Sequence, residues 1–98
     1  MTRLVTLTTD FGFGSGYVAE MKGRLLHAKT PLRLVDISHN IPSHDVRSAS
    51  WLLGQVCHGF PVDTLHIIVV DPGVGTERRM IWARIGNQEF ICPDNGIL

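Results

Sequence analysis

Hydrophobic and polar positions along the chain fall into two alternating kinds of pattern. Short runs rich in β-branched residues predict strands, and they cover residues 4–9, 32–37 and 65–70. Apolar residues at helical spacing predict amphipathic helices over 17–28 and 45–57. Two further short runs, 80–85 and 89–91, flank Gly86-Asn87, which is a hairpin signal. The predicted order is therefore βαβαβ followed by a hairpin.

This order is typical of a three-layer α/β/α domain with a mainly parallel sheet, here with an antiparallel hairpin extension. The run from Ile67 to Val70 has no polar alternation, so we expect a central strand covered on both faces. Ser15 and Ser43 are placed to cap the two helices, with Asp45 in the first turn of the second. We expect Trp51 and Trp82 in the core or at an interface.

Composition limits the classes of protein to consider. The 98 residues form one domain at most, and an apolar content of 44% supports a core. Nine acidic and nine basic residues cancel, which argues against nucleic acid or an anionic membrane as partner. The chain shows no signal peptide, no run long enough to span a bilayer, and no zinc or disulfide spacing at Cys57 and Cys92. We therefore expect a cytoplasmic protein with reduced cysteines.

The strongest chemical signal is a pair of aspartates at strand ends. Asp10 and Asp71 each close a predicted strand and precede a glycine-containing loop. If the two strands are neighbours, both carboxylates point into one crevice, where they could bind ribose hydroxyls, orient a water or hold Mg²⁺. Alternatively, each aspartate caps the loop that follows it. The glycines have neither P-loop nor GxGxxG spacing, which favours a ligand bound without a phosphate cradle.

Other polar residues are candidates for the same crevice. Arg78 or Arg79 could fold back across the glycine loop to meet Asp71. His44 either lines the pocket or is an exposed loop histidine, and both interpretations stay open. Pro93-Asp94-Asn95-Gly96 is most simply a turn, although Asp94 and Asn95 could join the site as a third loop.

Four segments, taken together, identify a family. They are Thr8-Thr9-Asp10-Phe11-Gly12, residues 35–42, residues 69–79 and Pro93-Asp94-Asn95-Gly96. In this order they resemble the amino-terminal part of the adenosine-forming S-adenosyl-L-methionine hydrolases, a family once catalogued as a domain of unknown function and related to the fluorinase and chlorinase enzymes. The resemblance covers all 98 residues.

The resemblance implies attack of water or hydroxide on C5′ of S-adenosylmethionine, with release of adenosine and L-methionine and with neither metal nor cofactor. It places Asp10 on the ribose hydroxyls, with Phe11 and His44 also in the substrate-binding set. Asp71 and Arg78 would be catalytic and handle the attacking water. The halogenating relatives carry tyrosine where this chain has Asp71, and a carboxylate repels halide but accepts a proton from water.

The resemblance also implies parts that this chain does not contain. A catalytic histidine and a carboxy-terminal β domain are expected beyond residue 98, so residues 1–98 would be the first part of the α/β domain and inactive alone. The full-length protein is expected to form a homotrimer. Two other functions remain as alternatives: a Mg²⁺-dependent phosphohydrolase that uses Asp10 and Asp71 as ligands, and a non-catalytic nucleoside-binding module.

Overall fold

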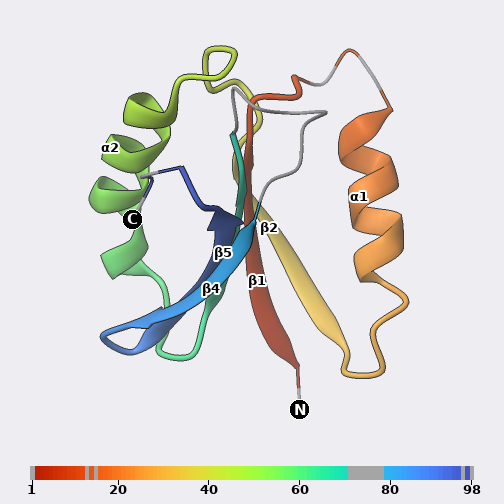
Figure 1. The fold of residues 1–98 in the computed structure, drawn as a ribbon. Coiled ribbons are helices and arrows are strands. Elements are labelled where there is room, and N and C mark those ends of the chain that lie inside the picture. The colour runs from red at the N-terminus through yellow and green to blue at the C-terminus, as the bar shows by residue number, and fades with distance from the viewer. Residues whose placement is uncertain (1, 13, 15, 71–78, 96, 98) are drawn as a thin grey trace.

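A five-stranded sheet lies between two helices on opposite faces (Figure 1). The computed structural model describes residues 2–12, 14, 16–70, 79–95 and 97. The elements are β1 (Arg3–Thr9), α1 (Tyr17–Leu25), β2 (Leu32–Ser38), α2 (Val46–Val56), a 3-10 helix (Cys57–Gly59), β3 (Leu65–Val69), β4 (Met80–Ile85) and β5 (Gln88–Pro93). The predicted α/β class, with three layers and a hairpin extension, is confirmed.

The strands follow the order β2-β1-β3-β5-β4. β1 runs parallel to both β2 and β3, and β5 runs parallel to β3. Only β4 is antiparallel to its neighbour among the described strands, because the tight hairpin at Gly86, where φ is +61°, joins it to β5. β3 is therefore the central strand, as the sequence predicts.

The hydrophobic core lies mainly between α2 and the sheet. Ala49 and Leu53 of α2 pack against buried side chains of β3 and β5, including Ile68 and Phe90. The opposite face is covered less completely, because alternate residues of β3 are only half-buried there. The sequence predicts that β3 is covered on both faces, but it is fully covered only on the face toward α2.

Neither tryptophan belongs to this core. Trp51 is 68% exposed and Trp82 is 64% exposed, so the expected core position is wrong for both, and the expected interface position stays a prediction. Trp51 occupies the outer side of α2, and Trp82 lies on the edge strand β4. Each has an apolar neighbour in the sequence that takes the inward position instead, Leu52 beside Trp51 and Ile81 beside Trp82.

The start of α2 differs from the sequence prediction. The N-cap is Asp45, whose carboxylate accepts the backbone N–H of Ser48 at 3.0 Å and its hydroxyl at 2.7 Å. These bonds hold the pKa of the Asp45 carboxyl below its usual value. Ser43 does not cap the helix, because His44 has a left-handed φ of +61° and the chain becomes helical only after Asp45.

Helix α1 is shorter than predicted. It begins after Gly16. The expected cap residue, Ser15, lies outside the described residues. The helix ends at Leu25 rather than Ala28, because the following amides bond three residues back and tighten the last turn. No helix in the described part of the chain combines the length and apolar character needed to cross a bilayer.

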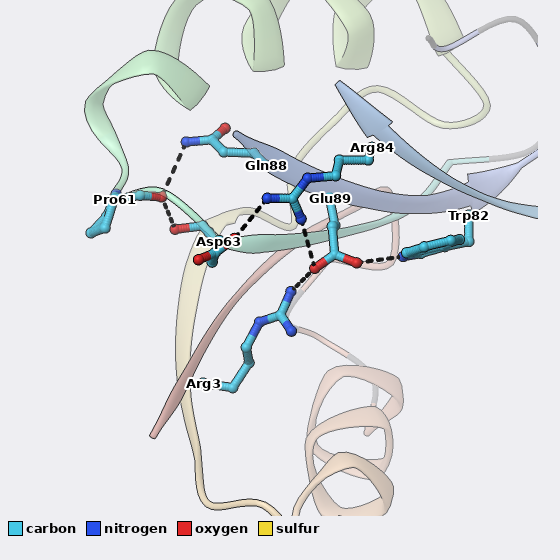
Figure 2. A network of polar contacts seen from close by, with 8 residues as sticks. Arg3, Pro61, Asp63, Trp82, Arg84, Gln88 and Glu89 are labelled. Carbon is cyan, nitrogen blue, oxygen red and sulfur yellow. Dashed lines mark hydrogen bonds and ion pairs between the residues drawn. The ribbon is translucent and has the colours of Figure 1, made fainter. Parts of the chain in front are cut away.

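A polar network ties the hairpin to the amino end of β1, at the end of the sheet opposite Asp10 (Figure 2). Glu89 of β5 forms an ion pair with Arg3 and accepts a hydrogen bond from the Trp82 indole N–H at 2.9 Å. Arg84 lies 3.7 Å from Glu89 and 2.8 Å from Asp63. These contacts cross β3 and join β1, β4 and β5 into one sheet.

His66 of β3 is a buried polar group in the core. Its Nδ1 lies 2.6 Å from Thr6 Oγ1 and its Nε2 lies 2.9 Å from Gln88 Oε1. Phe90 stacks on the ring, with centroids 5.0 Å apart, and Phe60 meets it edge-on. Burial lowers the pKa of His66, although the hydrogen bond to Gln88 works in the opposite direction. The prediction that His66 is structural is confirmed.

We expect His66 to make folding sensitive to acid. In the unfolded chain its imidazole takes up a proton as pH falls through ~6.5, whereas the folded protein resists protonation until lower pH. The free energy of unfolding should therefore be highest above that pH and fall below it, by at most ~1.4 kcal/mol per pH unit from this group. Urea unfolding of the full-length protein and of His66→Gln at several pH values measures the difference, and identical pH slopes would contradict this role.

Candidate active site

The site is built where the order of strands reverses. The chain passes from β1 to β2 on one side and later returns to place β3 on the other side of β1. Parallel sheets bind ligands at the carboxyl ends of strands at such a switch point. The register pairs Thr9 with Val69, so Asp10 and Val70 leave the sheet at the same edge. The condition for the predicted crevice, that the first and third strands are neighbours, is met.

Asp10 is half-buried at this edge, and its carboxylate is held by the chain segment that follows β2. Its Oδ2 accepts the backbone N–H of His44 at 2.7 Å. Asp10 therefore does not simply cap its own loop, because its partner lies 34 residues away. Among the described residues, none donates a hydrogen bond to Oδ1.

His44 contributes to the site through its backbone. Its left-handed φ of +61° turns the N–H toward Asp10, while its side chain is exposed. The imidazole is thus exposed, as the second interpretation drawn from the sequence has it, and its place in the substrate-binding set stays a prediction. The structure also gives the His44 backbone a function, holding the Asp10 carboxylate, which the residue type alone could not indicate.

Phe11 lies next to Asp10 on the α1 side of the sheet. Its half-buried ring meets Tyr17 edge-on, with centroids 5.9 Å apart. Phe11 lines an open, mainly apolar hollow of about 560 Å³ together with α1 residues Tyr17, Glu20, Met21, Arg24 and Leu25. An apolar wall thus adjoins the carboxylate.

The loop after β5 returns to the same edge, as the sequence suggested it could. The side-chain amide of Asn95 donates to the carbonyl oxygen of Val70 at 2.8 Å, which joins this loop to the end of β3. Asp94 instead forms an exposed ion pair with Arg79 at 2.7 Å. The structure therefore brings Asn95 to the candidate site and turns Asp94 outward.

Asp71 and Arg78 lie outside the described residues, so their assigned roles stay predictions. Arg79 is described, and its partner is Asp94. Among the described residues, no three side chains of the kinds that bind metals gather into a group.

Sequence reasoning assigned no function to His39, which lies behind this edge. It is fully buried between Thr9 Oγ1 and Asp36 Oδ1, each 2.7 Å from one ring nitrogen. The one signal in the sequence is the spacing of three residues between Asp36 and His39, which alone is too common to indicate contact.

Residues 5–98 match the family described as the SAM hydroxide adenosyltransferase N-terminal domain. The chain belongs to this family. It is 40% identical to the (R)-S-adenosyl-L-methionine hydrolase of Salinispora arenicola over 99% of its own length and 37% of that protein. It is also 26% identical to the fluorinase of Nocardia brasiliensis, over 86% of the chain and 28% of that protein. The family and its link to fluorinase, both inferred from the sequence, are confirmed.

Solved structures share the fold of this chain. A conserved hypothetical protein from Thermus thermophilus superposes with a TM-score of 0.86 at 39% identity, over 97% of this chain and 40% of that one. An uncharacterized conserved protein from Thermotoga maritima gives a TM-score of 0.88 at 35% identity, over 96% and 36% respectively. The chain thus spans well under half the length of these relatives.

Asn95 provides a test of the contact that joins the loop after β5 to the end of β3. Asn95→Asp replaces the amide donor by a carboxylate that faces the Val70 carbonyl, so we expect the free energy of unfolding to fall by ~1 to 3 kcal/mol. Asp94→Ala is the matched control, because it removes only an exposed ion pair and should change stability little. Urea unfolding of both full-length variants makes the comparison. Equal losses would contradict the role given to Asn95.

Proposed function

We propose that the full-length protein hydrolyses S-adenosyl-L-methionine to adenosine and L-methionine. The observation that carries the proposal is the Asp10 carboxylate, held by the His44 N–H at the switch point between β1 and β3. Membership of the hydroxide adenosyltransferase family supports the same reaction, as does the similarity to the (R)-S-adenosyl-L-methionine hydrolase of Salinispora arenicola.

In the proposed reaction a water oxygen forms a bond to C5′ of the ribose while the C5′–S bond breaks. The sulfur keeps the electron pair of that bond and loses its positive charge, so L-methionine leaves as a neutral thioether. One water proton is released, and the other stays on the new 5′ hydroxyl of adenosine. Because a sulfonium already leaves readily, the protein must mainly hold water and substrate in line and exclude bulk solvent.

In the proposal, different side chains bind the substrate and orient the water. Asp10 accepts hydrogen bonds from the ribose hydroxyls, an arrangement suited to a carboxylate at a strand end. Phe11 offers its ring as an apolar wall, and the backbone of His44 fixes Asp10. Asp71 orients the attacking water and accepts its proton, while Arg78 keeps Asp71 ionised. Asn95 lines the edge where these groups meet, and Asp94 supports its loop through Arg79.

The proposed reaction needs no metal and no cofactor, which separates it from the Mg²⁺-dependent phosphohydrolase alternative. Chromatography of S-adenosylmethionine incubated with the full-length protein should show adenosine and methionine in equal amounts, with or without EDTA. Loss of product on adding EDTA would favour the phosphohydrolase. Tight adenosine binding without turnover would favour a nucleoside-binding module.

We propose that the full-length protein is a cytoplasmic homotrimer. The free thiols of Cys57 and Cys92 are consistent with a reducing compartment. Exposed apolar side chains such as Trp82 and Met80 are available for contacts beyond this part of the chain. Sedimentation velocity measures the mass in solution, and a monomer would contradict the trimer.

Asp10→Ala should weaken the binding of adenosine as well as of substrate, because both carry the ribose hydroxyls. Hydrogen bonds to a charged group contribute ~1.5 to 3 kcal/mol, so the dissociation constant of adenosine should rise at least about tenfold. Calorimetric titration of the full-length variant with adenosine measures it. An unchanged affinity would remove Asp10 from the ribose.

Asp71→Asn should lower kcat far more than it raises KM, since its carboxylate is assigned to the water and not to the substrate. Loss of a general base costs roughly a hundredfold or more in rate. Steady-state kinetics of the full-length variant give both constants. An equal loss in binding and turnover would count against this assignment.

A further inference from the structure

The buried His39 connects the end of β2 to the end of β1. Its Nδ1 lies 2.7 Å from Thr9 Oγ1 and its Nε2 lies 2.7 Å from Asp36 Oδ1. The backbone N–H of Phe11 also donates to Thr9 Oγ1, at 3.2 Å. Because that oxygen already accepts a hydrogen bond, its own hydrogen is best directed to His39 Nδ1, which leaves the ring hydrogen on Nε2 facing Asp36. Each donor thus points the same way, from the Phe11 N–H through Thr9 and His39 to the Asp36 carboxylate.

An irregularity in β2 allows this arrangement. β1 and β2 pair residue by residue up to Leu7 and Asp36, and then Thr8 pairs with Ser38. One extra residue of β2, Ile37, is therefore accommodated in a bulge just before His39. Bulges bend a strand and redirect the side chains that follow, and they are common beside active sites.

Backbone bonds join the same two segments on either side of Asp10. Gly12 N–H donates to the His39 carbonyl oxygen at 2.7 Å, with Gly12 at a φ of +71°, and Ile41 N–H lies 3.4 Å from the Thr9 carbonyl oxygen. The His44 N–H then reaches Asp10 itself. The position of the Asp10 carboxylate therefore depends on how the segment that begins at His39 is held against Thr9.

The far end of this chain of bonds is anchored on α1. Asp36 Oδ2 accepts a hydrogen bond from Lys22 Nζ at 2.8 Å. Burial opposes the charged form of Asp36, but hydrogen bonds from Lys22 and then from His39 outweigh it and lower the pKa of this carboxyl. Asp36 is therefore a charged acceptor that holds His39 in one orientation.

We propose that His39 is a positioning residue, which sets the Asp10 carboxylate in the orientation that binds the ribose hydroxyls. The inference rests on the proposed function for the identity of the ligand. His39 is fully buried, so it does not touch the substrate and acts through Thr9 and the segment 39–44. A role in stability alone is the competing explanation.

The protein contains a matched control for this explanation. Thr6 and Thr9 are both fully buried residues of β1, and each Oγ1 lies close to the Nδ1 of a buried histidine, 2.6 Å for His66 and 2.7 Å for His39. Only the pair at Thr9 adjoins Asp10. Thr6→Val and Thr9→Val each remove the hydrogen bond to a buried histidine without changing side-chain size. Thr9→Val also removes the bond from the Phe11 N–H, so it should lower stability at least as much as Thr6→Val.

The expected results separate the two variants. In the full-length protein, Thr9→Val and His39→Gln should raise the dissociation constant of adenosine about tenfold, whereas Thr6→Val should change it less than about twofold. Thr9→Ser keeps the hydroxyl and should restore most of the affinity. In an Asp10→Ala background, Thr9→Val should have little further effect, because it acts through that carboxylate.

Equal weakening by Thr6→Val and Thr9→Val, or additive effects of Thr9→Val and Asp10→Ala, would overturn the proposal. Amide hydrogen exchange of residues 40–45, measured without ligand, provides a readout independent of the reaction. It should accelerate in Thr9→Val and His39→Gln but not in Thr6→Val. If the wild-type protein neither binds adenosine nor forms it from S-adenosylmethionine, the proposed function fails. Unchanged exchange in Thr9→Val would instead overturn the positioning role of His39.

Discussion

The parallel pairing of β1 with β3 is the constraint on which the candidate site depends. Because Thr9 pairs with Val69, two chain segments separated by about sixty residues leave the sheet at one edge. The loops after β1, β2 and β5 then meet there through three specific contacts, Asp10 with the His44 N–H, Thr9 with His39, and Asn95 with the Val70 carbonyl. A different strand order would separate these groups, whatever their chemistry.

Polar groups inside the sheet reinforce that order. β1 carries two buried threonines that each bond a histidine from another segment, Thr6 with His66 of β3 and Thr9 with His39 after β2. Buried polar groups are costly unless they are paired, so each pair disfavours arrangements that leave its members without a partner. The pair at Thr6 joins β1 to its central neighbour, and the pair at Thr9 joins it to the segment that holds Asp10. The same kind of bond thus stabilises the fold at one position and shapes the site at the other.

Patterns local in the sequence were sufficient to predict the strands, the hairpin at Gly86 and the class of fold. They also gave the strand-end position of Asp10, because a β-branched run followed by a glycine loop shows where a strand stops. Features that depend on residues close in space but distant in the sequence could not be predicted from these patterns. Asp45 caps α2 in place of Ser43 because of a left-handed turn at His44, and His39 reaches Thr9 because of a bulge in β2. Residue types do not report either of these backbone features. The family resemblance came from four separated segments, and it assigns roles to Asp71 and Arg78 that lie outside the described residues.

In the proposed reaction, one edge of the sheet presents Asp10 to the sugar and Asp71 to the reacting carbon. A crystal structure of the full-length protein with adenosine bound tests this most directly. We expect both ribose hydroxyls within hydrogen-bonding distance of the Asp10 carboxylate, with that carboxylate still bonded to the His44 N–H and with Asp71 facing C5′. Adenosine bound at another edge of the sheet, or an Asp71 side chain directed away from C5′, would contradict it.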